Sequence, residues 1–321
     1  MKKKLTYISI PFLIALILII LWLIVNKNLD KINISETLVY IKDNNIYKRT
    51  NDWTNQEILY TSKQSEQLSK LKANGNFIAF RNGTNLSILN SKNLDIKIID
   101  SNPDDFSWID SKSQLSFISN NNLNIYSNAG ESISSQSLTD INGISSLISK
   151  VYSLKTSFDG SYIQINNKVV DLKNKKILNG QYSLNSIWSS NQNQFIDALS
   201  LQDMGGLFEY SLDNGNVTTY KFPDSIALNS DSAIYETNSN NIYYILFNTI
   251  KLVDTSKGEV INTIKYDSLN SYLDLKFQSK GNKSFVATES IGDSTYRVMN
   301  LTLDGKIKDT TFEANEVTWL E

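Results

Sequence analysis

A unit that recurs about every 41 residues is the sequence feature that most restricts how this chain folds. In each copy a large residue closes one short strand, a polar turn follows, and an apolar strand begins about seven residues later. The clearest copies run from Trp108 to Leu115, from Trp188 to Phe195 and from Phe277 to Phe285; weaker ones run from Leu71 to Ile78, Thr156 to Ile163 and Tyr235 to Ile242. A unit of this length holds four short strands with their turns.

The residues within each unit alternate as β-strands do. From Thr37 onward, short runs such as 77–80 and 86–89 alternate apolar and polar side chains and are separated by Asn, Asp, Gly and Ser. Four-stranded units of this period stack as the blades of a β-propeller, because each blade buries its faces only against its neighbours. We therefore predict an all-β fold over residues 37–321, a β-propeller of seven blades. An expected inserted loop at 139–153 makes the fourth repeat irregular and leaves six or eight blades as alternatives.

The two ends of this region predict how the ring closes. The region begins with three apparent strands, at 38–41, 46–48 and 58–60, and it ends with a single strand at 317–320. The C-terminal strand then supplies the missing first strand of the first blade. Such a composite blade leaves no exposed edge at the point where the ring closes.

Three blade openings resemble a known repeat. They read SFDGSYI at 157–163, WSSNQNQFI at 188–196 and ANGNFIAF at 73–80. These segments resemble the W-S-P-D-G-x-x-I-A-F repeat of TolB-like and WD40-like propellers, although no copy has the proline and the Gly-His and Trp-Asp marks of WD40 repeats are missing. The resemblance implies a propeller fold and transfers no functional residue.

A membrane anchor is predicted ahead of the propeller. Residues 5–25 carry no charge over 21 positions, which as a helix reach roughly 31 Å, the thickness of a hydrocarbon core. The run is longer than the apolar region of a cleaved signal peptide. Three lysines precede it at 2–4 and two follow at 27 and 31, which places the N-terminus in the cytoplasm. We predict a cytoplasmic tail at 1–4, a signal-anchor helix at 5–25, a linker at 26–36, and an extracytoplasmic propeller on a single-pass protein of the cell membrane.

The composition excludes several chemistries. The chain has no histidine and no cysteine, so Ser-His-Asp and Cys-His nucleophiles, histidine metal sites and thiolate zinc sites cannot be built from it. The net charge of −2 has no basic excess, which argues against a nucleic-acid partner. We predict no enzyme activity, no cofactor, no metal and no catalytic residue.

Few residues stand out as candidates for binding. Asp104 and Asp105 lie beside Trp108, where paired carboxylates can serve glycoside hydrolysis or calcium binding, although acidic residues at turns explain them more simply. Trp53 lies outside the repeat register, on an expected turn, and is the aromatic residue best suited to a binding surface. The predicted binding surface is therefore Trp53, Asp104 and Asp105, whereas the tryptophans at 108, 188 and 319 recur in the repeat and are predicted to pack between blades.

Two functions fit these observations. We favour a non-catalytic protein-binding or scaffold domain, displayed outside the membrane, that engages a protein or a cell-envelope polymer through one propeller face. The alternative is a membrane-tethered carbohydrate-active or carbohydrate-binding protein that uses carboxylates and aromatic residues at that face. An acidic pair in the central channel would favour the alternative.

Overall fold

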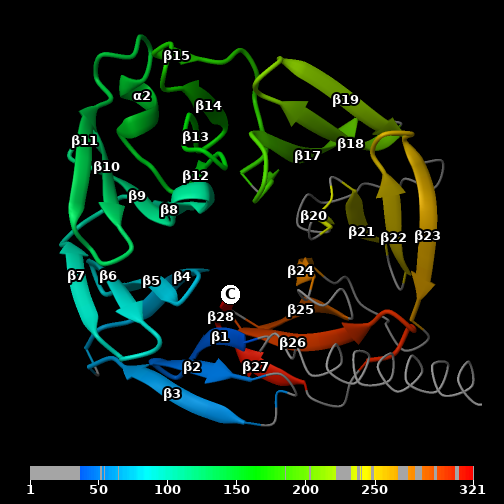
Figure 1. Cartoon of the computed structure of the whole chain (residues 1–321), viewed down its shortest axis with the longest axis horizontal. Coiled ribbons are helices and arrows are strands. Elements are labelled where there is room, and N and C mark those ends of the chain that lie inside the picture. The colour runs from blue at the N-terminus through cyan, green and yellow to red at the C-terminus, as the bar shows by residue number, and fades with distance from the viewer. Residues whose placement is uncertain are drawn as a thin grey trace, which may run out of the picture. The chain divides into compact units, whose positions relative to one another are not determined.

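Seven four-stranded antiparallel sheets surround a common centre in the computed structural model (Figure 1). The structure describes residues 37–321 except 51–52, 54, 64, 185, 202–203, 222–232, 237–238, 240, 247–248, 267–273, 279–283, 293–294, 308–310 and 321. The all-β fold, the β-propeller architecture and the count of seven blades are confirmed. The predicted tail at 1–4, anchor at 5–25 and linker at 26–36 lie outside the described residues. Within the described part of the chain, no helix is both long enough and apolar enough to cross a membrane.

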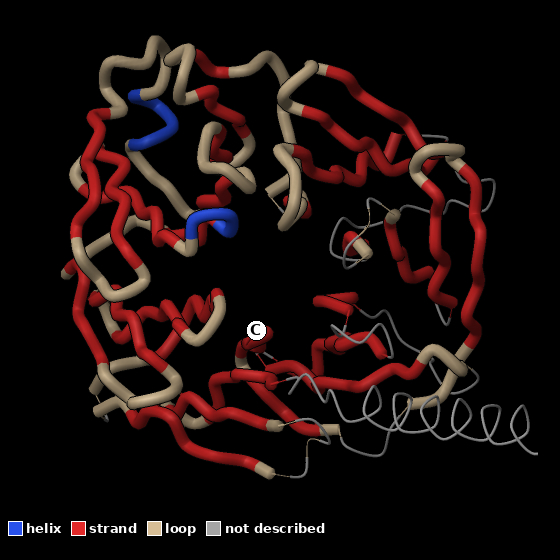
Figure 2. The backbone as a smooth tube through the Cα atoms, viewed as in Figure 1, coloured by secondary structure: helices blue, strands red, loops and turns tan. Residues whose placement is uncertain are grey.

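The blades follow one another along the chain. Figure 2 shows that strands make up most of each blade. Blade 1 contains β28 (Glu316–Leu320), β1 (Thr37–Lys42), β2 (Asn45–Arg49) and β3 (Gln56–Thr61). Blade 2 contains β4 (Leu68–Asn74), β5 (Phe77–Asn82), β6 (Asn85–Asn90) and β7 (Ile96–Asp100). Blade 3 contains β8 (Phe106–Ile109), β9 (Gln114–Ser119), β10 (Asn122–Ser127) and β11 (Ser132–Ser137).

The remaining four blades follow the same order. Blade 4 contains β12 (Leu154–Thr156), β13 (Tyr162–Ile165), β14 (Lys168–Asp171) and β15 (Lys176–Ile177). Blade 5 contains β16 (Ile187–Trp188), β17 (Gln194–Leu201), β18 (Met204–Ser211) and β19 (Asn216–Lys221). Blade 6 contains β20 (Ala233–Tyr235), β21 (Ile242–Leu246), β22 (Thr249–Asp254) and β23 (Glu259–Lys265), and blade 7 contains β24 (Asp274–Gln278), β25 (Ser284–Gly292), β26 (Thr295–Thr302) and β27 (Phe312–Ala314).

The C-terminal strand closes the ring, as the two ends of the sequence predict. β28 pairs antiparallel with β1, with Thr318 opposite Val39. The Glu316 carboxylate at the start of β28 then accepts hydrogen bonds from the backbone N–H groups of Lys70, at 2.7 Å, and Leu71, at 2.5 Å. One strand therefore completes blade 1 and also contacts the first strand of blade 2.

Apolar side chains fill the spaces between neighbouring blades, which explains the alternation along each strand. Val39 and Ile41 of blade 1 pack with Ile78 and Phe80 of blade 2 in one buried cluster. Between blades 7 and 1, Leu38 and Tyr40 meet Val286 and Val298 in another such cluster. Each blade is thus stabilised by apolar contacts with its two neighbours.

The segment predicted as an inserted loop is packed into the fold. Residues 139–153 contain the short helix α2 (Ser145–Ile148) and follow the last strand of blade 3. Its buried side chains join a cluster with residues of blades 3 and 4: Ile141, Ile144, Ile148 and Val151. The irregular fourth repeat is therefore a complete blade with a helical insertion before it.

The strand pairing corrects two anchors of the repeat. In blade 7, Phe285 pairs with Gln278, one residue after the expected anchor Phe277. Trp108 pairs with Leu115 and Trp188 pairs with Phe195, as expected from the sequence. In the second repeat, Ile78 pairs with Ala73, two residues after the expected anchor Leu71. The turn between β4 and β5 is shorter here because Gly75, at φ +56°, permits a tight reversal.

Candidate functional site

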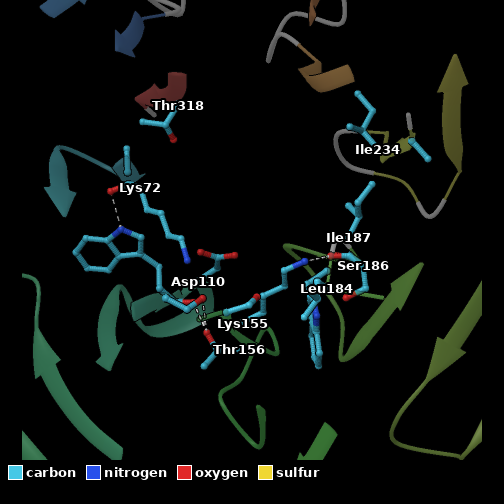
Figure 3. A pocket seen from close by; sticks show the side chains of 15 residues that line it. Lys72, Asp110, Lys155, Thr156, Leu184, Ser186, Ile187, Ile234 and Thr318 are labelled. Carbon is cyan, nitrogen blue, oxygen red and sulfur yellow. Dashed lines mark hydrogen bonds between the residues drawn. The ribbon is translucent and has the colours of Figure 1, made fainter. Parts of the chain in front are cut away.

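A cavity of about 650 Å³ lies at the centre of the ring and is the candidate site (Figure 3). Its walls come from the innermost strands of blades 1 to 6, namely β28, β4, β8, β12, β16 and β20, and from the segments just before β12 and β16. Inner strands of a propeller present alternate side chains to the centre. The described lining ranges from one residue of blade 1, Thr318, to four residues in and just before β16 of blade 5. We call this cavity the central channel.

Two lysines reach into the central channel and tie successive blades together (Figure 3). Lys72 Nζ donates hydrogen bonds to the carbonyl oxygens of Phe106, at 2.5 Å, and Leu154, at 3.4 Å. Lys155 Nζ donates to the carbonyl oxygen of Ser186, at 2.5 Å. Both lysines thus contact backbone of the next blades and place positive charge on the channel wall.

The nearby carboxylates are held by other groups. Asp105 forms an ion pair with Lys70 at 2.8 Å, and Asp110 accepts a hydrogen bond from Asn74 Nδ2 at 3.1 Å. Among the described residues, no carboxylate oxygen lies within ion-pairing distance of Lys72 Nζ. Burial lowers the pKa of Lys72, and the negative charge of Asp105 partly opposes this effect. An anionic group that entered the channel would relieve this unfavourable burial of the ammonium.

Two tryptophans of the repeat, Trp108 and Trp188, hydrogen-bond to the neighbouring blade at the channel wall. Trp108 Nε1 donates to the carbonyl oxygen of Lys72, at 3.1 Å, and Trp188 Nε1 donates to Gln164 Oε1, at 2.9 Å. Each indole therefore hydrogen-bonds to the preceding blade and packs in a cluster that spans two blades. The predicted packing role is confirmed for Trp108 and Trp188, whereas the side chain of Trp319 lies outside the described residues.

The channel has a polar side and an apolar side. Hydroxyl groups line it from blades 1, 3 and 4, together with the two lysines; they belong to Thr318, Ser107, Ser153 and Thr156. Blades 5 and 6 and the segment before β16 present mostly apolar side chains, those of Leu184, Ile187, Trp188, Ala233 and Ile234. Ser186 lies among them, and its carbonyl oxygen accepts the hydrogen bond from Lys155. The channel can therefore contact a negative charge and an apolar group at the same time.

Asp104 and Asp105 are not among the residues that line the channel. Asp105 is only 4% exposed, and its second oxygen accepts the Leu154 N–H at 2.8 Å. Burial raises the pKa of Asp104, while the positive charge of Arg81 lowers it. Of the described residues that line the channel, Asp110 supplies the one carboxylate. The two acids that glycoside hydrolysis requires are therefore not found among them.

Trp53 requires a correction. Its side chain is only 3% exposed and packs edge-on against Phe312 of β27, with ring centroids 5.5 Å apart. Its backbone, at φ +61°, turns the indole into the cluster between blades 7 and 1. The Arg49 guanidinium donates to the Trp53 carbonyl oxygen and lies 4.4 Å from the Phe312 ring centroid. The expectation of a surface aromatic residue at this position is wrong because the indole is buried against Phe312.

The channel lysines were missed from the sequence, although a signal for them exists. Lys155 comes just before the predicted anchor Thr156. Lys72 comes just before Ala73, which only the strand pairing identifies as the anchor of blade 2. A residue next to an anchor points to the opposite side of its strand. The residue before each anchor lines the channel in blades 1 to 6, so this position predicts much of the lining. Four anchors also reach the channel, namely Ala73, Trp108, Thr156 and Trp188.

Comparisons with known proteins support the fold and no more. No known protein family matches the sequence, and no curated protein matches it. The dihydro-heme d1 dehydrogenase NirN in complex with DHE is similar in structure, with 11% sequence identity and a TM-score of 0.52, over 88% of this chain and 74% of that one. TolB from Acinetobacter baumannii has 13% identity and a TM-score of 0.48 over 88% and 66%, and a chain of a nidogen/laminin complex has 8% and 0.48 over 89% and 98%.

Proposed function

We propose that this chain is a non-catalytic binding propeller, anchored in the cell membrane and displayed outside the cytoplasm, whose central channel receives an acidic segment of a partner protein. The proposal rests on the presence, in one channel, of two lysines, Lys72 and Lys155, and of aliphatic side chains from blades 5 and 6. An ammonium held by backbone carbonyls keeps a fixed position, so it can select a carboxylate rather than merely attract one.

A polypeptide segment suits this channel better than a small metabolite does. The channel combines the positive charges of Lys72 and Lys155 with the apolar side chains of Ile187 and Ile234. A peptide segment with an acidic residue beside an aliphatic one would match both features. Loops of a propeller gather on two faces, so a partner that enters the channel also has a broad rim to contact. Contacts inside the channel then determine specificity, and contacts on the rim add buried surface area.

The membrane anchor is supported by the sequence alone. Residues 5–25 are long enough and apolar enough to span a bilayer, and the linker at 26–36 is short. Such an arrangement keeps the propeller close to the bilayer. We therefore place the partner at or near the extracytoplasmic membrane surface.

Photo-crosslinking in native membranes tests this function. A photoreactive amino acid at Thr318 or Ile187 reports on the channel, and the same group at Ile98, which is 63% exposed on the outer strand β7, is the matched control. We expect one partner to be captured from both channel positions and not from Ile98, with capture reduced about tenfold by Lys72→Met. Capture of the same proteins from Ile98, or capture unaffected by Lys72→Met, would contradict the proposal.

A further inference from the structure

A second cavity, of about 490 Å³, lies away from the channel between blades 4 and 5, and we call it the flank cavity. The outer strand of blade 4, β15, has two residues, whereas the outer strand of blade 5, β19, has six. Because blade 4 ends early at its outer edge, the face of blade 5 that would be covered by a longer strand stays open. The flank cavity is lined from both blades, and its volume falls within the roughly 300–1,000 Å³ typical of small-ligand sites.

Aromatic rings form one wall of the flank cavity. Trp188, Phe195 and Tyr210 stack across the strands of blade 5, with ring centroids 4.9 and 4.8 Å apart. The stack ends at Tyr210, which lines the cavity, and Tyr182 stands perpendicular to Tyr210 at 5.2 Å. Tyr162 adds a third tyrosine from blade 4. Rings fixed in this way offer a rigid apolar surface with polar hydroxyl edges.

The hydroxyl groups of these tyrosines differ in what they can offer a ligand. Tyr162 donates to the carbonyl oxygen of Leu212 at 3.2 Å, and Tyr182 donates to that of Asn179 at 3.1 Å, so both are already engaged. The Tyr210 hydroxyl has no protein hydrogen-bond partner among the described residues. Tyr210 is therefore the group whose donor and acceptor positions remain for a bound molecule.

The polar lining mixes both charges with amides. Asp171 is only 5% exposed, and its carboxylate is oriented by the backbone and side-chain N–H groups of Asn174, at 2.9 and 2.7 Å. Asp213, Lys176 and Asn216 also line the cavity. The two aspartates disfavour a phosphate or sulfate, and the lysine disfavours a simple cation. No group of metal-ligating residues is found in the part of the chain that the structure describes.

We propose that the flank cavity binds a short, uncharged stretch of a saccharide chain. The C–H faces of a sugar ring pack on tyrosine rings, and its hydroxyls both donate to carboxylates and accept from amide and ammonium groups. The site opens on the outside of the ring, so a long glycan can lie across it without threading through the channel. The proposal does not depend on what the central channel binds.

Titration with defined sugars tests the proposal. The full chain is purified in a detergent without sugar groups and titrated with linear di- to tetrasaccharides of neutral hexoses and of N-acetylated hexosamines, followed by saturation-transfer NMR and calorimetry. We expect at least one member to bind with a Kd of about 1 mM or tighter. Val217→Arg, at a residue 53% exposed on the cavity wall, should weaken that binding at least about tenfold by blocking the site.

Two matched controls keep the test specific. Val260 is 42% exposed and occupies the position of Val217 in blade 6, so Val260→Arg should change the Kd less than about twofold. Tyr210→Phe removes only the hydroxyl and should weaken binding about three- to tenfold, whereas Tyr126→Phe, at the same position of blade 3, should not. Absence of binding at 10 mM of every sugar, or binding that survives both Val217→Arg and Tyr210→Phe, would overturn the proposal.

Discussion

Glu316 fastens the closing strand to the second blade, and its removal should weaken the ring. Its two carboxylate oxygens accept the N–H groups of Lys70 and Leu71. These two residues lie in a bulge, outside the register of the β4–β5 pair, and Lys70 has φ +54°. Glu316→Ala therefore leaves two N–H groups without their acceptor, at a point where the sheet offers no replacement.

The size of the effect follows from these two contacts. A hydrogen bond to a charged group contributes about 1.5–3 kcal/mol. Glu316 is half-buried, so each of its two hydrogen bonds is placed at the lower end of that range, which gives about 3 kcal/mol in total. Glu316→Gln keeps one acceptor oxygen and should lose about half as much. For a domain of this size, about 3 kcal/mol corresponds to a fall of roughly 6 °C or more in Tm.

Guanidinium unfolding of the full chain, followed by tryptophan fluorescence, measures this loss. The control is Glu313→Ala, because Glu313 is exposed and its contact with Lys42 is a 3.8 Å surface ion pair. That control should lose no more than about 0.5 kcal/mol. A free energy of unfolding for Glu316→Ala that stays within about 0.5 kcal/mol of the unaltered chain would contradict this prediction.

Two further predictions concern buried groups and turns. Burial raises the pKa of the Glu209 carboxyl, although the hydrogen bond from the Tyr220 hydroxyl opposes this effect. The folded state therefore holds the proton more tightly than the unfolded state does. The contribution of Glu209 to the free energy of unfolding falls as the pH rises above about 4.5. Glu209→Gln should remove that fall, seen as a smaller change in unfolding free energy between pH 4 and 7, and equal pH profiles would contradict it. Gly305→Ala should destabilise the chain more than Gly215→Ala does. Both glycines have a positive φ, but only at Gly305 would a Cβ press against the Lys265 carbonyl oxygen. Gly215→Ala should lose about 1–2 kcal/mol in thermal unfolding, and equal losses for the two variants would contradict this prediction.

Much of the architecture could be predicted from the sequence because it depends on periodic features. The spacing of Trp108, Trp188 and the other anchors reflects four strands per blade, and the alternation along each strand reflects burial between blades. The composite first blade followed from counting strands at both ends, and β28 pairs with β1 accordingly. These signals are repeated along the chain, so seven blades are predicted although the irregular segment at 139–153 leaves six or eight as alternatives; the structure has seven.

The binding residues were harder to predict because they depend on contacts that are distant in the sequence. Asn51 and Asp52 make the segment around Trp53 look like an exposed turn, yet Phe312 near the other end of the chain covers the indole. The flank cavity follows from the two-residue length of β15. The run of lysines and asparagine at 173–176 does not reveal where that strand begins or ends.

The most direct measurement of the central claim is the affinity of the channel for its captured partner. The partner segment that crosslinks to Thr318 and Ile187 is synthesised as a peptide and titrated into the full chain at two salt concentrations. The account predicts that Lys72→Met raises the Kd about tenfold or more and reduces its salt dependence, while Lys92→Met, at an exposed turn, leaves both unchanged. Equal Kd values for Lys72→Met and the unaltered chain, with the fold intact, would contradict the claim.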